Sequence, residues 1–271
     1  MQPAQLRIAT GLTVVLGAAI WCRSIARAYP GGPLQDVTDA APYCAGCHSS
    51  TDANQLRDMQ GPRKQQMLSA SHISAIKAGQ GNYSKLSPEQ RNQLAADVEK
   101  VDDNAKVSIE VPAVLSRGAN FAARVQAQGG SGPVIGIMLL DDDVRNQSRA
   151  IEAEGFAIVG APEVIGPDGK RQEQWEVRRY DDLARNLNFL VVFAIKADLA
   201  TNQFSTSKVT YNLTAPSKPG RYTMCAGFLY GTEKASPIGR VEIHGQTQPL
   251  GGFSGASGRI RFSELKTIEV R

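Results

Sequence analysis

The spacing of hydrophobic residues changes near Lys106, and this change constrains the fold more than any other feature of the sequence. Three apolar residues at helical spacing precede it: Leu94, Val98 and Val101. Three apolar residues that alternate with other side chains follow it: Val107, Ile109 and Val111. Because 271 residues are enough for two domains, we predict a helical domain over residues 36–103 and a β-rich domain over residues 104–250.

The second region has the strand and turn pattern of an antiparallel β-sandwich. The runs Val134–Leu140 and Phe189–Ile195 are dense enough in apolar residues for buried strands. The segment Leu213–Met224 resembles the corner and penultimate strand of immunoglobulin-like folds, and we expect the Tyr222 hydroxyl to bond to upstream backbone. In the C-terminal tail, residues 251–271, the runs 259–262 and 266–270 could form one more hairpin.

The helical region contains one strong helix start. Ser87 is a suitable N-cap, Pro88 occupies the first helical position, and Gln90 stands three residues after the cap. A second helix is predicted over residues 64–78. Its apolar side carries five residues: Met67, Leu68, His72, Ile73 and Ile76.

The N-terminal segment has the pattern of an export signal. Ile8–Trp21 has no charge and follows Arg7, and the small-residue pattern Ala26-Arg27-Ala28 comes after it. We therefore predict a signal peptide over residues 1–28, a linker over residues 29–35, and a periplasmic or otherwise extracytoplasmic protein. Membrane association is expected only if the N-terminal segment is retained as an anchor.

The charge distribution argues against nucleic acid as a partner. Lys and Arg number 30 against 26 Asp and Glu, and three of the arginines lie in the predicted signal segment. The sequence has no basic stretch interleaved with aromatic residues, which is the pattern that tracks a phosphate backbone.

The motif Cys44-Ala45-Gly46-Cys47-His48 carries the chemistry of the chain. Two thiols at this spacing can form thioethers with the two haem vinyl groups, and the adjacent imidazole can bind the iron. A zinc site would need two more ligands at matching spacing, and a thioredoxin-like disulfide would need a βαβ context. The sequence has neither, and the motif resembles that of the c-type cytochromes.

The resemblance to monohaem c-type cytochromes of class I extends over about residues 36–103. Gly61-Pro62 is similar to a family pair whose proline carbonyl orients the proximal histidine, here His48. Residues 76–81 followed by residues 86–89 are similar to the family's helix, glycine loop and final helix. The resemblance implies a small all-α cytochrome c-like domain with one covalent haem c. The expected fold class is thus α + β multidomain, with the immunoglobulin-like sandwich following the haem domain.

The distal iron ligand departs from the family pattern. The resemblance places a methionine just after Gly81, where this chain has Asn82-Tyr83-Ser84. His72 is the leading alternative, because it shares a helix face with Ile76, whose family equivalent packs against the haem. Met67 and Tyr83 are the other candidates.

Electron transfer is the function expected from these features, with the protein an electron carrier rather than a catalyst. The haem would change oxidation state while the sandwich docks onto redox protein partners or a multisubunit complex. Two alternatives stay open. In one, an open distal site makes the protein a haem enzyme or a sensor of peroxide or a diatomic gas. In the other, the protein is a structural subunit.

Overall fold

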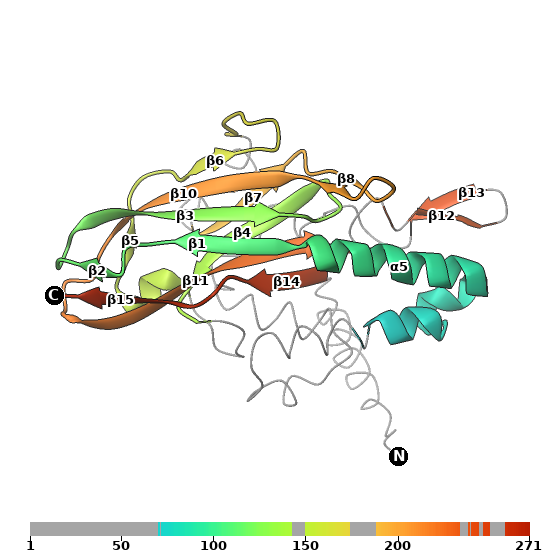
Figure 1. Cartoon of the computed structure of the whole chain (residues 1–271), viewed down its shortest axis with the longest axis horizontal. Helices are drawn as coiled ribbons and strands as arrows, with labels where there is room; N and C mark the ends of the chain where they lie inside the picture. The colour runs from blue at the N-terminus through green and yellow to red at the C-terminus, as the bar shows by residue number, and fades with distance from the viewer. Residues whose placement is uncertain are drawn as a thin grey trace, which may run out of the picture.

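The structure is a computed structural model in which two large β-sheets pack face to face and helix α5 (Pro88–Asn104) extends from one end of them (Figure 1). The C-terminus lies at the opposite end. The structure describes these residues: 70, 72–142, 150–173, 188–233, 238, 240–243, 246–249 and 258–271. The haem motif and the predicted signal segment lie outside them.

The first sheet has the strand order β1-β3-β10-β5, and β6 pairs with another stretch of β10. Its strands are β1 (Lys106–Glu110), β3 (Asn120–Gln128), β5 (Ala157–Ile158), β6 (Glu163–Ile165) and β10 (Thr206–Thr214). All of their pairings are antiparallel. Val125 stands opposite both Ile109 and Val209, so three neighbouring strands present apolar side chains to the same buried face.

The second sheet has the order β2-β15-β11-β4-β7. Its strands are β2 (Val114–Leu115), β4 (Val134–Leu140), β7 (Phe189–Phe193), β11 (Gly220–Gly231), β14 (Gly258–Phe262) and β15 (Lys266–Val270). β15 and β2 are parallel, which makes the sheet mixed. The hairpin expected in the C-terminal tail is wrong: β14 and β15 each pair with a different stretch of the long strand β11.

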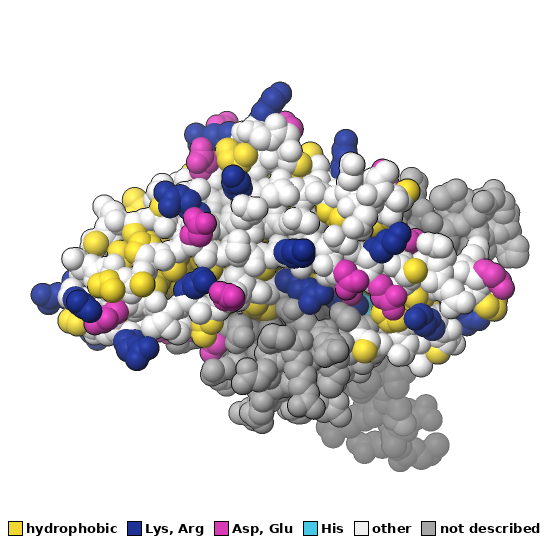
Figure 2. Space-filling model, viewed as in Figure 1, with side chains coloured by type: hydrophobic (Ala, Val, Ile, Leu, Met, Phe, Trp, Pro, Cys, Tyr) yellow, Lys and Arg dark blue, Asp and Glu magenta, His cyan; other side chains and the backbone are white. Residues whose placement is uncertain are grey.

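Shorter elements complete the described fold. They are the 3-10 helices η1 (Gly81–Lys85) and η2 (Ile151–Glu154), and the two-stranded ribbons β8 (Ala197–Asp198) with β9 (Gln203–Phe204) and β12 (Arg240–Ile243) with β13 (Gln246–Pro249). Basic and acidic side chains are interspersed over the face of the molecule in Figure 2.

The main core lies between the two sheets and receives alternate side chains from each. Every residue of β4 is buried, because Ile135, Ile137 and Leu139 enter the main core while Met138 and Leu140 join a second cluster on the other face of the sheet. Burial on both faces explains why the sequence of this strand is a continuous apolar run rather than an alternating one.

Local predictions from the sequence are confirmed at two places. Ser87 and Gln90 form the expected capping box at the start of α5: Gln90 N–H donates to the Ser87 hydroxyl at 3.2 Å, and Ser87 N–H donates to the Gln90 side chain at 2.8 Å. The Tyr222 hydroxyl donates to the carbonyl of Lys218 at 2.9 Å. Of the predicted helix over residues 64–78, residues 72–77 are helical, and residues 64–69 lie outside the described part.

The predicted fold class is wrong, and so is the resemblance to class I cytochromes as a description of the fold. The described residues are mainly mixed β-sheet and contain no all-α domain. The helices expected to close such a domain are joined to the sheets instead. Val101 of α5 belongs to the main core, and Ile238 packs against both that core and the helical cluster.

Contacts also cross the predicted domain boundary at about residue 104. Only Ala105 separates α5 from β1. Lys100 Nζ donates to the carbonyl of Leu199 at 3.0 Å, and Asn104 Nδ2 donates to the side chain of Asn202 at 3.2 Å. The boundary stays a prediction, and the two regions are in direct contact. Among the described helices, none has the length and apolar character that a membrane crossing requires.

Candidate functional site

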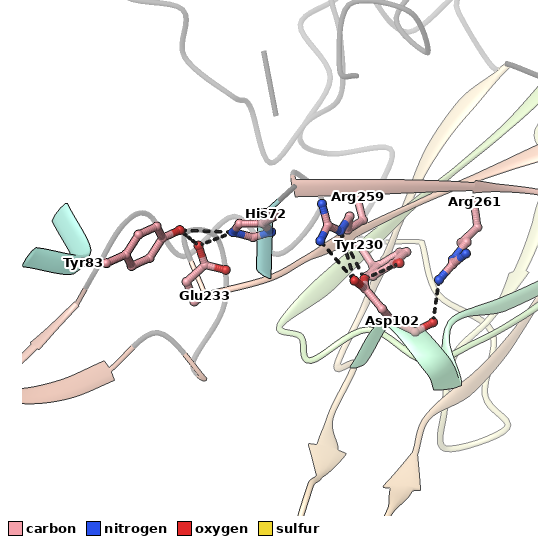
Figure 3. A network of polar contacts seen from close by, with 7 residues as sticks. All are labelled: His72, Tyr83, Asp102, Tyr230, Glu233, Arg259 and Arg261. Atoms are coloured by element: carbon pink, nitrogen blue, oxygen red, sulfur yellow. Dashed lines mark hydrogen bonds and ion pairs between the residues drawn. The ribbon is translucent and has the colours of Figure 1, made fainter. Parts of the chain in front are cut away.

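Two of the predicted site residues, His72 and Tyr83, lie side by side and share an unpredicted partner, Glu233 (Figure 3). The other predicted site residues lie outside the described residues: Cys44, Cys47, His48, Pro62 and Met67. The site that can be built from the structure therefore consists of His72, Tyr83 and Glu233.

The chain turns back sharply between His72 and Tyr83, which brings the two side chains together. His72 lies in the helical stretch 72–77, and the turn that follows contains Gly79, which has a φ of +68° that favours glycine. Tyr83 follows in η1. Tyr83 belongs to a small apolar cluster, as does Ile73, the residue next to His72. The members of the cluster are Ile73, Ile76, Tyr83, Leu86, Leu94, Ala95 and Val98.

Glu233 reaches the same place from the second sheet. It stands two residues after the end of β11, 161 residues from His72 in sequence. Its side chain is fully buried, and that of His72 is 12% exposed. Glu233 therefore ties the helical stretch to the sheet.

All three polar groups meet at one carboxylate oxygen. His72 Nε2 lies 2.9 Å from Glu233 Oε1 and 3.1 Å from the Tyr83 hydroxyl oxygen, and the Tyr83 hydroxyl donates to Glu233 Oε1. An ionised carboxylate only accepts hydrogen bonds, so His72 Nε2 must carry a proton. In the neutral imidazole, this assigns the lone pair to Nδ1.

The electrostatics of the site keep Glu233 ionised and Tyr83 neutral. Burial alone would raise the pKa of the Glu233 carboxyl, but the hydrogen bonds and charge supplied by His72, together with the Tyr83 hydrogen bond, lower this pKa to about 2. Burial and the neighbouring Glu233 carboxylate raise the pKa of Tyr83. The phenol therefore stays protonated and acts as a donor.

Two atoms of the site have no hydrogen-bond partner within the described part of the chain. They are His72 Nδ1 and Glu233 Oε2, and both are buried. A buried nitrogen with a free lone pair can bind a metal ion or accept a hydrogen bond, and leaving it without either is unfavourable. In the neutral form of the ring, the donor set around His72 fits an iron ligand that binds through Nδ1.

A second buried polar cluster joins α5 to the second sheet (Figure 3). Asp102 accepts hydrogen bonds from Arg259 on both carboxylate oxygens, at 3.1 to 3.2 Å, and from the Tyr230 hydroxyl at 2.8 Å. Arg261 Nη2 donates to the main-chain carbonyl of Asp102 at 2.9 Å. Both carboxylate oxygens are used, so this cluster has the character of a structural tie.

Within the described ranges, no group of three or more His, Cys, Asp or Glu side chains could hold a metal ion by itself. A comparison of the sequence with protein-family models and with curated proteins found no match.

Sequence reasoning named His72 and Tyr83 but missed Glu233. An acidic residue just after a hydrophobic strand is ordinary in a surface turn, and nothing in the sequence near Glu233 distinguishes it from one. Only the pairing of β11 with its neighbours brings this carboxylate into contact with His72 and Tyr83.

Proposed function

We propose that this protein carries one haem c covalently and transfers electrons with it. The observation that carries the proposal is the motif Cys44-Ala45-Gly46-Cys47-His48, in which two thiols and an imidazole have the spacing needed to bond the two vinyl groups and the iron of one haem. The proposal does not depend on a class I cytochrome fold, because the attachment chemistry lies within these five residues.

Different residues of this chain would attach, ligate and orient the haem. Cys44 and Cys47 would anchor it, His48 would be the proximal ligand, and the Pro62 carbonyl would accept the remaining N–H of His48 and orient the ring. His72 is the proposed distal ligand, with Met67 and Tyr83 as the alternatives. The buried, unpartnered Nδ1 of His72 supports this choice. When bound, the haem supplies a reversible one-electron couple.

The compartment and the partners follow from the same proposal. The uncharged run Ile8–Trp21 and the pattern Ala26-Arg27-Ala28 support export, with the mature chain beginning near Tyr29. The electron donor and acceptor are then redox proteins or subunits of a larger assembly outside the cytoplasm. We propose that these partners dock on the two sheets, which contain most of the described strands.

The test is covalent attachment in the full-length protein produced in a host that matures exported c-type cytochromes. The denatured protein should keep its red chromophore and show a mass gain of roughly one haem, and Cys44→Ala or Cys47→Ala should lose one or both thioether bonds. Cys225→Ala is the matched control, because Cys225 is buried in β11 and should not affect attachment. Haem that acidic organic solvent extracts from the wild type, or a protein that takes up no haem, would contradict the proposal.

A further inference from the structure

We propose that Glu233 is the positioning residue for the distal haem ligand: it holds the Nε2–H of His72 and thereby presents Nδ1 of the same ring to the iron. This inference rests on the haem proposed above and deepens it. It assigns a role to a residue that is far from the haem motif in the sequence.

The burial of Glu233 requires an explanation of this kind. Its side chain has no exposure to solvent, and both of its hydrogen-bond partners, His72 and Tyr83, come from one short stretch of chain. Removing a carboxylate from water costs several kcal/mol, by order of magnitude. A site with this composition is therefore better suited to orienting the imidazole than to stabilising the fold.

The pattern of used and unused atoms indicates a metal ligand. Metal-binding histidines generally donate their second ring N–H to a carboxylate or carbonyl, which fixes the tautomer and raises the basicity of the ligating nitrogen. Here Nε2 is bound to Glu233 Oε1 at 2.9 Å, while the buried Nδ1 has no partner in the described residues. Tyr83 donates to the same carboxylate oxygen and so helps to hold the carboxylate in place.

A purely mechanical role for Glu233, as a tie between helix and sheet, makes different predictions. The Asp102 cluster already joins α5 to the sheet, and its carboxylate oxygens are both satisfied by donors. A tie affects only the stability of the fold. A positioning residue also affects the strength of the bond between His72 and the iron, and this bond can be measured separately.

The experiment uses the full-length, haem-loaded protein and the variant Glu233→Gln. Glutamine keeps the size of the side chain but removes the charge, so the bond between His72 and the iron should weaken about 10- to 100-fold. Carbon monoxide must displace His72 from ferrous iron, so its apparent affinity should rise by the same factor. A basic ligand stabilises ferric iron more than ferrous iron. The ferric bond should therefore weaken more than the ferrous bond, and the midpoint potential should rise by about 59 mV for each factor of ten by which the two losses differ.

Two control variants separate positioning from stability. Asp102→Asn neutralises the other buried carboxylate, and should lower the unfolding temperature while leaving the carbon monoxide affinity and the potential unchanged. Tyr83→Phe removes one hydrogen bond to Glu233 but keeps the contact between Glu233 and His72, and should give a smaller change than Glu233→Gln.

The outcomes distinguish this inference from the function on which it rests. If His72→Ala opens the iron to carbon monoxide but Glu233→Gln changes neither the affinity nor the potential, the inference is wrong and the haem proposal stands. If His72→Ala changes nothing, His72 is not the ligand, and the inference fails while covalent haem is unaffected. Absence of covalent haem from the wild type overturns both.

A measurement on the wild type keeps the inference testable if Glu233→Gln does not fold. In ferric protein labelled with ¹⁵N-histidine, paramagnetic NMR should show Nδ1 of His72 bound to iron and an exchangeable proton on Nε2. Iron bound to Nε2, or an Nε2 without a proton, would overturn the inference.

Discussion

The Asp102 cluster joins α5 to the second sheet, and substitutions in it should destabilise the fold strongly. Asp102→Ala removes the acceptor for Arg259 and Tyr230, which are both buried, and leaves a guanidinium and a phenol without their partner. The Arg259 side chain is only 6% exposed, so water cannot replace the carboxylate without opening the site.

The magnitude follows from the hydrogen bonds that are lost. A bond to a charged group contributes about 1.5 to 3 kcal/mol and a neutral one about 0.5 to 1.5 kcal/mol. Removing one partner of a buried ion pair costs about 3 to 5 kcal/mol in total, because the remaining charge stays buried. For a chain of this size, this corresponds to a fall in unfolding temperature of about 6 to 20 °C.

The assay is urea unfolding followed by circular dichroism, with the same substitution at the next residue as its control. Asp103 is exposed, so Asp103→Ala should change the free energy of unfolding by less than about 0.5 kcal/mol. The double variant Asp102→Leu with Arg259→Met should recover much of the loss, because no unpaired charge is left buried. A loss below about 1 kcal/mol in Asp102→Ala, or a double variant no more stable than Asp102→Ala, would refute the reasoning.

Two further predictions concern the start and the end of α5, and thermal unfolding checks both. Ser87→Ala removes the side-chain acceptor of the capping box and should cost about 1 kcal/mol, whereas Ser84→Ala, at an exposed position in η1, should cost less. Gly129→Ala should lower the free energy of unfolding by at least about 3 kcal/mol. Gly129 has a φ of +106°, and a Cβ there would lie 2.6 Å from the main-chain oxygen of Asn104. Gly118→Ala is its control: the φ is +64° and no atom lies within 4 Å of the added Cβ, so equal losses in the two variants would contradict the steric argument.

Local features of this chain could be predicted because the interactions that make them span few residues. The capping box of α5 lies within Ser87–Gln90, and the Tyr222 hydroxyl bonds to a carbonyl four residues upstream. The run Val134–Leu140 forms β4 with the bounds expected from its composition. In each case the residue types and their spacing contain the physical cause.

The fold class could not be predicted in the same way, because an apolar helix face does not determine which element packs against it. Leu94, Val98 and Val101 were interpreted as the inner face of an all-α domain. Leu94 and Val98 do pack in a small helical cluster, but Val101 enters the core between the sheets. The helix and its buried side were correctly predicted, and its packing partner was not.

The sequence by itself determined where the main helix begins, where the strands run, and which residues could attach and ligate a haem. The tertiary structure alone decided which distant groups meet: Glu233 with His72 across 161 residues, and Arg259 with Asp102 across 157. The physical reason is that Glu233 follows β11 and Arg259 lies in β14, so the place of each strand in the sheet decides which residues these side chains meet. Such pairing depends on the burial of whole faces, which no short stretch of sequence specifies.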